Sequence, residues 1–312
     1  MITGAVSAFS EPRRVINMDI LAILFLLAVI TVLISHYVVP IMSVLNLFTA
    51  FIAIKVIAER FDMDLKNLGV WFFGFTLASL VVVALQVIGC EPVYFKHFQE
   101  VAGLSELPWV MGCTFVLILP FLMGIHPALG ILAVPMIWMS HSSACVVAGF
   151  ITASFFLIGK HTKAMLCTTL FAPVAVIAFV ARDGIDHNRL DVFKNGLSYF
   201  GNLWIGNGLG TWAHMPFRHE VSEGTFLWWR WVHNEYYQHA YEQGIIGLFL
   251  LLILCLVLFI FSTSKVIRSA LLGLYALCIL HPVLHWPKLV YLVVFIIAVA
   301  LSEQSNKLEE ST

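Results

Sequence analysis

Long apolar runs recur along most of this chain, and only short polar stretches separate many of them. Apolar residues make up 61% of the 312 residues and charged residues 11%, whereas a soluble domain carries about 25% charged residues. Lipid cannot satisfy open backbone groups, so such runs predict helices that cross a membrane. The predicted fold is therefore an all-α, polytopic membrane helix bundle.

The sequence predicts about ten transmembrane helices, because a span needs about 20 apolar residues. The candidate runs cover residues 17–39, 41–58, 68–89, 108–124, 126–140, 142–159, 164–181, 244–263, 266–284 and 287–302. The two runs on either side of His126-Pro127 are short and also fit a kinked or re-entrant pair. The predicted range is therefore about nine to eleven spans.

Clusters of Lys and Arg orient the predicted bundle, because cytoplasmic loops carry an excess of these residues. The clusters are Arg13 and Arg14, then Lys55, Arg60 and Lys66, then Lys160 and Lys163, and finally Lys265 and Arg268. With about ten spans, all of them fall on one side. We therefore expect cytoplasmic N- and C-termini.

This topology divides the chain into three parts. Residues 1–181 form an N-terminal transmembrane bundle of about seven spans. Residues 182–243 form a periplasmic loop, which carries most of the motifs discussed below. Residues 244–312 form about three C-terminal spans followed by a short cytoplasmic tail.

The predicted loop contains four arginines, which are Arg182, Arg189, Arg218 and Arg230. Positive charge avoids the outer side in short loops, so we expect these arginines to hold an anion; alternatively, a long loop translocates whatever its charge. Residues 190–204 have apolar side chains at helical spacing and predict an amphipathic surface helix. Arg189 would lie in its first turn beside free N–H groups, where it could bind phosphate or, alternatively, lipid headgroups.

Closely spaced glycines follow this predicted helix, at Gly206, Gly208 and Gly210. No strand precedes them, so the pattern is not a dinucleotide-binding motif. Alone it predicts a tight turn. Successive N–H groups in such a turn can also form a concavity that binds an anion.

Residues 233–247 place ionisable and aromatic side chains at the mouth of an apolar run, where charged groups are costly unless they are solvated or paired. On one straight helix, His233 shares a face with Tyr236 and Tyr237, while Glu242 lies on the opposite face. His233 and Glu242 could then not act as a pair. Either Glu242 pairs with a loop arginine, which we favour, or Gly244 breaks the helix.

No metal or cofactor site is predicted. His239 and Glu242 form an HxxE pair, but a second histidine at helical spacing on the same face is missing. The six cysteines are scattered without CxxC spacing, and they predict small buried apolar residues. They are Cys90, Cys113, Cys145, Cys167, Cys255 and Cys278.

The order of these motifs over about residues 130–262 resembles the O-antigen ligase and O-antigen polymerase superfamily, bacterial membrane enzymes that move glycans off a polyprenyl diphosphate carrier. The matching pieces are the polar cluster at His141-Ser142-Ser143-Ala144, then Arg189, Gly206-Asn207-Gly208-Leu209-Gly210, His233-Asn234 and Glu242-Gln243-Gly244-Ile245-Ile246-Gly247. Family members usually carry an arginine in the polar cluster, which this chain lacks. His141, or one of Arg182, Arg218 and Arg230, would have to supply that charge.

The resemblance implies a fold similar to the glycosyltransferase C superfamily and a bacterial inner-membrane enzyme of lipopolysaccharide or surface polysaccharide assembly. It implies transfer of a polyprenyl-diphosphate-linked glycan to a hydroxyl acceptor, such as a glycan or the lipid A core, without metal or nucleic acid. His233 would be the base and Arg189 the diphosphate clamp. Residues expected to bind substrate are Arg218, Arg230, Asn234, Tyr237, Glu242, Gly206, Gly208, Gly210 and His141.

Two other functions remain open. A polymerase would join lipid-linked repeat units instead of using the lipid A core. A transporter of lipid-linked oligosaccharides would instead carry internal repeats and ionisable groups at mid-membrane. Here the charges lie near span ends or in the loop, which favours a site at the outer surface.

Overall fold

The computed structural model describes part of the chain. The described residues are 65–90, 104, 107–157, 196–197, 200–208, 211–214, 218–222, 225–228, 234–262, 264–279, 281, 283–285 and 289–299. The predicted spans at 17–39, 41–58 and 164–181 lie outside these residues.

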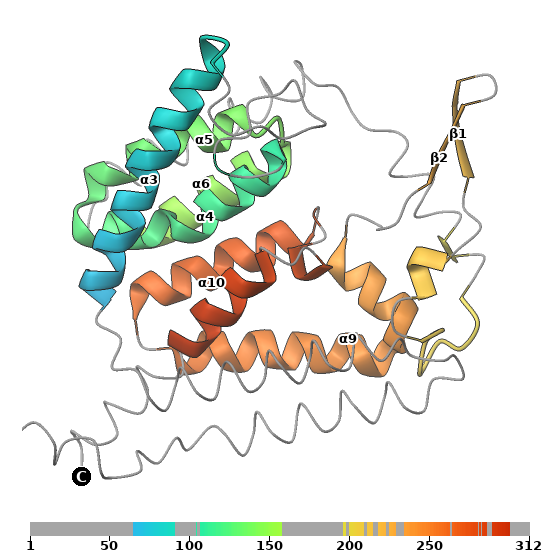
Figure 1. Ribbon diagram of the computed structural model, residues 1–312. Coiled ribbons are helices and arrows are strands. Elements are labelled where there is room, and N and C mark those ends of the chain that lie inside the picture. Colours follow the sequence, from blue (N-terminus) through green and yellow to red (C-terminus); the bar gives the residue numbers. More distant parts are fainter. Residues whose placement is uncertain are drawn as a thin grey trace, which may run out of the picture.

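The described part is helical apart from one two-stranded sheet (Figure 1). The α-helices are α3 (Leu65–Val87), α4 (Pro108–Ile125), α5 (Val134–Met139), α6 (Ser143–Leu157), α9 (Glu235–Phe261) and α10 (Lys265–Cys278). The 3₁₀ turns are η2 (Pro127–Ala133), η3 (Thr211–His214) and η4 (Val283–His285). A further short apolar helix covers Leu289–Val299.

Three of the described helices are long and apolar enough to cross a membrane, namely α3, α4 and the Glu235–Ile260 part of α9. This finding agrees with the predicted membrane association. Between α4 and α6, the chain forms η2 and then α5, which is 6 residues long. The run at 126–140 is thus divided between a 3₁₀ turn and a short helix, which agrees better with the kinked alternative than with one regular helix.

Helix α4 lies at the centre of the described bundle. It packs against α3, α6 and α10, and most of its side chains are buried. Phe72 of α3 meets Phe121 of α4 edge-on, with 5.0 Å between ring centroids. Gly273 lets α10 approach Thr152 of α6, where a Cβ atom would collide with the threonine hydroxyl. Small residues at such contacts allow close packing of helices in membranes.

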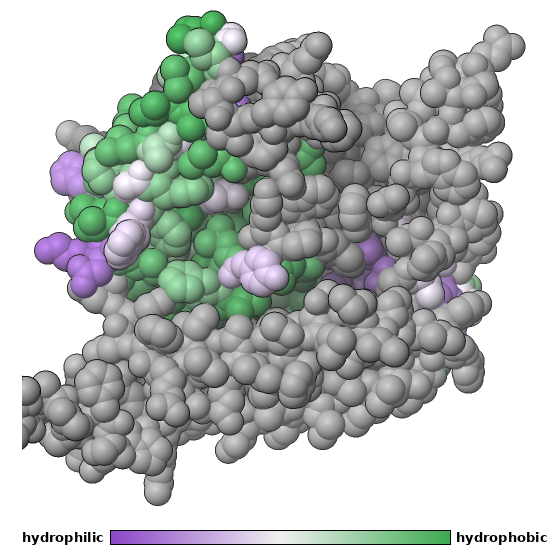
Figure 2. Space-filling view, viewed as in Figure 1, coloured by the Kyte–Doolittle hydropathy of each residue, from purple (hydrophilic) through white to green (hydrophobic). Residues whose placement is uncertain are grey.

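The outward surface of α3 is apolar. Trp71 is 78% exposed and Val81 is 59% exposed, and Figure 2 shows mostly hydrophobic side chains over this part of the molecule, with hydrophilic ones on its left and lower left. Large apolar residues of α9 are also exposed at helical spacing, at Phe249, Leu252 and Leu256. Lipid chains would cover such surfaces without a cost in unpaired polar groups.

One end of the bundle joins several connections that are distant in sequence. His281, which follows α10, stacks on Trp109 at the start of α4 with ring centroids 5.2 Å apart. Its Nε2 atom lies 2.5 Å from Ser142 Oγ, just before α6. Leu284 N–H donates to Glu235 Oε1 at the start of α9, over 2.6 Å. These are the helix ends that the charge pattern assigns to one side of the membrane.

The opposite end joins the remaining connections. Gly69 of α3 lies against Ile125, where an added Cβ would be 2.9 Å from Cγ1. Gly124 lies against Val266 of α10, where an added Cβ would be 3.0 Å from Cγ2. The described helices therefore alternate in direction, as consecutive membrane spans do.

The structure of the described residues between 182 and 243 differs from the sequence prediction in two ways. Gly196 and Leu197 are helical, but residues 200–202 are not, so the predicted helix does not reach Trp204. Further along, the Asn202 side chain forms a local turn in place of helix, because its Oδ1 accepts from Trp204 N–H at 2.9 Å. The loop also contains an antiparallel hairpin that the sequence prediction lacks, formed by β1 (Arg218–Ser222) and β2 (Thr225–Trp228).

The topology can be tested by cysteine labelling. The background would carry Cys90→Ser, Cys167→Ser and Cys255→Ser, which leaves the buried thiols in place. We expect Leu203→Cys to react with an impermeant maleimide in intact cells, and Asn67→Cys to react only after lysis, because both sites are exposed but lie at opposite ends of the predicted topology. The reverse labelling pattern would overturn the predicted orientation.

Candidate functional site

The structure describes some of the predicted site residues and leaves others outside. Arg189, Gly210, Arg230 and His233 lie outside the described residues, and for Arg218 only the backbone in β1 is described. The roles expected of these residues therefore stay predictions. The described members of the predicted site are Asn234, Tyr237, Glu242, Gly206, Gly208 and His141.

Helix α9 is broken at Gly244. This residue has φ 69° and ψ −171°, a conformation outside the helical region that is essentially restricted to glycine. A Cβ here would collide with the Trp204 carbonyl. The loop backbone can therefore approach α9 this closely only because residue 244 has no side chain. Of the two alternatives left open by the sequence, a helix break at Gly244 is confirmed. Figure 1 shows the resulting bend between the first turns of α9 and its long apolar part.

The glycine-rich turn docks onto this break through backbone hydrogen bonds. Asn207 N–H donates to Tyr241 O at 3.0 Å, and Gly208 N–H donates to Glu242 O at 2.8 Å. On the other side of the break, Ile245 N–H donates to the Leu203 carbonyl at 2.9 Å. The turn therefore supplies partners for helical groups that the break at Gly244 would otherwise leave unpaired.

Gly206 serves this close approach. It has φ 72°, and an added Cβ would lie 2.5 Å from the backbone nitrogen of Gln243. Gly206 N–H donates to Asn202 O at 2.8 Å. Because the N–H groups of Gly206, Asn207 and Gly208 all donate to carbonyls of the chain, they do not form the open anion-binding concavity that the spacing suggested. The described glycines bring two protein segments together instead.

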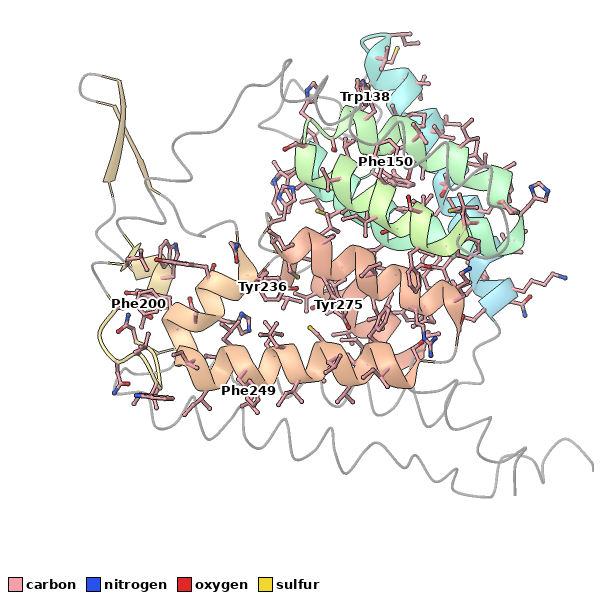
Figure 3. All side chains as sticks on the ribbon, turned by 180° about the vertical axis from the view of Figure 1, so that it is seen from behind. Trp138, Phe150, Phe200, Tyr236, Phe249 and Tyr275 are labelled. Carbon is pink, nitrogen blue, oxygen red and sulfur yellow. The ribbon has the colours of Figure 1, made fainter. Side chains whose placement is uncertain are left out.

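Four aromatic rings hold the loop against the first turns of α9. Trp212 is fully buried, and its ring meets Tyr237 and Tyr241 edge-on, with centroids 5.9 Å and 5.0 Å apart. Phe200 meets the same two tyrosines edge-on, at 5.8 Å and 5.2 Å. Such edge-to-face contacts add stability beyond the area that the rings bury. Phe200 appears beside the start of α9 in Figure 3.

Tyr236 and Tyr237 have separate environments, contrary to the expectation that they share one face with His233. The Tyr236 hydroxyl donates to the carbonyl of Tyr275 in α10 at 3.1 Å, and both side chains lie between the two helices (Figure 3). Tyr237 belongs to the aromatic cluster with Phe200 and Trp212. Tyr236 therefore anchors α9 to α10, and Tyr237 anchors the loop.

Asn234 is the N-cap of α9. Its Oδ1 accepts from Tyr237 N–H at 2.8 Å, which satisfies one of the free donors of the first helical turn. The predicted base, His233, is therefore the residue that directly precedes the cap. The backbone of Asn234 itself is extended, with φ −151° and ψ 110°.

Two buried acidic side chains line one side of the first turns of α9. Glu235 is fully buried and caps η4 through Leu284 N–H, and its carbonyl is 3.1 Å from His239 Nδ1. Glu242 is also buried, and its Oε1 accepts from Gln238 Nε2 at 3.0 Å. Buried carboxylates require such partners. The expected pairing of Glu242 with an arginine involves side chains outside the described residues.

The polar cluster before α6 has two different parts. His141 is exposed and has a positive φ of 51°, which is uncommon for a residue with a side chain. Ser142 is buried and lies within hydrogen-bonding distance of His281 Nε2. Among the residues that the structure describes, the buried histidine at this end of the bundle is His281.

Sequence reasoning missed Glu235, His281 and Trp212 as organising residues. Glu235 had a recognisable signal, since an acidic residue directly after an asparagine cap is favoured in the first turn of a helix. His281 had none, because its partners Trp109 and Ser142 are more than a hundred residues away in the sequence.

Comparison with protein families, with curated proteins and with solved structures found no match to this chain. The fold and the composition therefore define the chain as a helical protein suited to a membrane. Its activity is a matter for proposal and test.

Proposed function

We propose that this chain is a metal-independent membrane glycosyltransferase, similar to O-antigen ligases, that moves a polyprenyl-diphosphate-linked glycan to a hydroxyl acceptor on the periplasmic side. One observation supports the proposal most directly. Two pieces of the motif pattern, the glycine-rich turn and the Glu242-Gln243-Gly244 segment, meet through backbone hydrogen bonds. They are separated by about 35 residues in the sequence. An ordinary transmembrane helix satisfies its own backbone groups and would not require this contact.

The contact between the glycine-rich turn and α9 gives the proposed site a rigid support. The broken helix, the docked turn and the aromatic cluster of Phe200, Trp212, Tyr237 and Tyr241 fix the backbone immediately after His233. A catalytic side chain on such a rigid support keeps its position without further ordering when substrate binds. The proposed site therefore lies where the loop meets the start of α9.

The proposed reaction is displacement at the anomeric carbon. The acceptor oxygen forms a bond to this carbon while the bond to the diphosphate oxygen breaks. His233 takes the hydroxyl proton, a role for which imidazole is well suited near neutral pH. Arg189 stabilises the negative charge that develops on the polyprenyl diphosphate, because a guanidinium binds phosphate through two parallel hydrogen bonds.

The proposal can be tested with the purified full-length chain in detergent, a lipid-linked glycan and either of two acceptors. We expect glycan on the lipid A core. Growth of the lipid-linked glycan instead would assign a polymerase and overturn the ligase proposal. Movement of the lipid-linked glycan across a liposome bilayer with no new glycosidic bond would assign a transporter.

Arg189→Lys is expected to reduce transfer at least about tenfold, a change that corresponds to about 1.4 kcal/mol in the activation barrier. Lysine keeps the charge but loses the planar fork that binds phosphate through two bonds. The measurement is the initial rate of transfer at equal amounts of protein in the membrane. Arg218→Lys and Arg230→Lys are the matched variants, and a large loss in one of them with normal activity in Arg189→Lys would move the clamp to that residue.

A further inference from the structure

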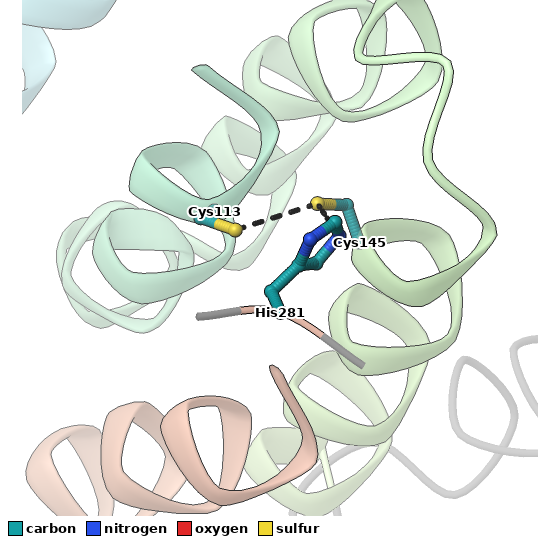
Figure 4. A group of neighbouring side chains, drawn as sticks. All are labelled: Cys113, Cys145 and His281. Atoms are coloured by element: carbon teal, nitrogen blue, oxygen red, sulfur yellow. Dashed lines mark hydrogen bonds between the residues drawn. The ribbon is translucent and has the colours of Figure 1, made fainter. Parts of the chain in front are cut away.

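Three side chains that the proposed reaction does not use converge inside the bundle. Cys113 comes from α4, Cys145 from α6 and His281 from the segment after α10, and all three are buried (Figure 4). The two sulfurs are 3.7 Å apart, and Cys145 Sγ is 3.8 Å from His281 Nε2. One ligand atom from each residue lies within 4.8 Å of the others. We propose that these residues form a structural zinc site.

Two of the three separations suit ligands that share one ion, and the third is at most 4.8 Å. Zinc binds thiolate at about 2.3 Å and imidazole at about 2.0–2.1 Å in tetrahedral geometry, which puts two sulfurs about 3.8 Å apart and a sulfur and a nitrogen about 3.5 Å apart. The observed 3.7 Å and 3.8 Å are close to these values. The two thiols are within hydrogen-bonding distance of each other, and the same spacing also allows them to share a metal ion.

The imidazole of His281 is oriented by its neighbours. Its ring lies flat against Trp109, with an angle of 8° between the planes. Ser142 Oγ is near Nε2, and it also accepts from Cys145 N–H at 3.3 Å. The stacked Trp109 fixes the plane of the ring, while Ser142 Oγ, which contacts the ligating Nε2, would have to turn away when the ion binds. Nδ1 of His281 has no hydrogen-bond partner in the part of the chain that the structure describes.

The donor atoms select the ion. Two sulfurs and one imidazole nitrogen suit Zn²⁺ or Cu⁺, whereas Mg²⁺ and Ca²⁺ take oxygen ligands. Binding replaces the two thiol protons, which are released. Two thiolates then balance the charge of Zn²⁺ and leave an excess negative charge with Cu⁺. Because an uncompensated charge is costly in an apolar interior, the site favours Zn²⁺.

Such an ion would join α4, α6 and the segment after α10 at the end of the bundle where η4 meets Glu235 of α9. It would stabilise the arrangement of helices and would take no part in glycan transfer. The proposal is therefore independent of the proposed reaction.

The test is metal binding to the purified full-length chain after treatment with a chelator. We expect about one Zn²⁺ per chain by elemental analysis, with a loss in affinity of at least about 10–100-fold in Cys113→Ser and in Cys145→Ser. Cys255→Ser, on the apolar part of α9 and outside the cluster, is the matched control and should bind as the wild type does.

A second measurement needs no variant. Wild-type protein loaded with Co²⁺ should show absorption bands from thiolate-to-metal charge transfer. Added Zn²⁺ should displace the Co²⁺ and abolish these bands. Wild-type protein that takes up neither Zn²⁺ nor Co²⁺ would overturn the proposal. Uptake of Cu⁺ without Zn²⁺ would overturn the assignment of the ion, and equal binding by wild type, Cys113→Ser and Cys145→Ser would overturn the assignment of the ligands.

Discussion

His233→Ala is expected to reduce glycan transfer by about 10²–10⁴-fold, the usual contribution of a general base. The protein should remain folded, because the Asn234 cap and the aromatic cluster that hold the start of α9 do not include this side chain. Neutral imidazole accepts the proton, so the wild-type rate should fall at acidic pH, and the variant should lose that dependence. The measurement is transfer from lipid-linked glycan across pH 5–9.

His239→Ala is the matched control for this prediction. Its imidazole lies beside the carbonyl of Glu235 within α9, whereas His233 precedes the Asn234 cap of that helix. We expect a much smaller loss of transfer. Transfer by His233→Ala at the wild-type rate would show that another residue is the base, and a loss well below about 100-fold would indicate a positioning role.

Gly244→Ala is expected to disrupt the contact between the loop and α9. The backbone conformation alone should cost about 1–3 kcal/mol for a residue with a side chain, and the added Cβ would also collide with the Trp204 carbonyl. The loop could then not stay docked on the helix break. We expect a lower melting temperature of the purified protein, faster proteolysis near residue 204 and loss of transfer.

Gly74→Ala separates this effect from a general effect of replacing glycine. Gly74 is also in a helix, α3, but an added Cβ there meets nothing within 4 Å. Its stability should be equal to the wild type or slightly higher, because alanine is the better helix former. A melting temperature unchanged in Gly244→Ala would contradict the proposed docking of the loop at the break.

Hydrophobic runs predicted α3 and α4 closely, but the run at 244–263 missed the first turns of α9, which begins at Glu235. The run at 68–89 corresponds to α3 (Leu65–Val87), and the run at 108–124 corresponds to α4 (Pro108–Ile125). A long run of apolar residues without charges has few other stable conformations in lipid, so its length and position determine the element. The number of spans over the whole chain stays a prediction.

Local competition explains where the loop prediction was wrong. Helical spacing alone extended the predicted helix to Trp204, but the Asn202 side chain forms a turn with the following N–H groups and competes with the helix. The hairpin had a signal in Gly224, which lies between the two strands. The strands β1 and β2 are 5 and 4 residues long, too short for alternation to be distinctive.

The two sites differ in how far the sequence could predict them. The break at Gly244 was one of two alternatives, because glycine within a helical pattern marks a position where a helix can end. The cluster of Cys113, Cys145 and His281 could not be predicted, since its members come from three separate helical regions. Only the packing of α4 against α6 and α10 brings them together.

The break in α9 also has a consequence for the surrounding bilayer. After Gly244, the helix runs from Ile245 to Phe261, which at a rise of 1.5 Å per residue is about 26 Å long. The hydrocarbon core of a typical bilayer is about 30 Å thick. The bilayer becomes locally thinner around a span that is shorter than its hydrocarbon core. Headgroups beside α9 would thus be drawn inward, and the lipid carrier of the proposed reaction would present its phosphates closer to the docked loop.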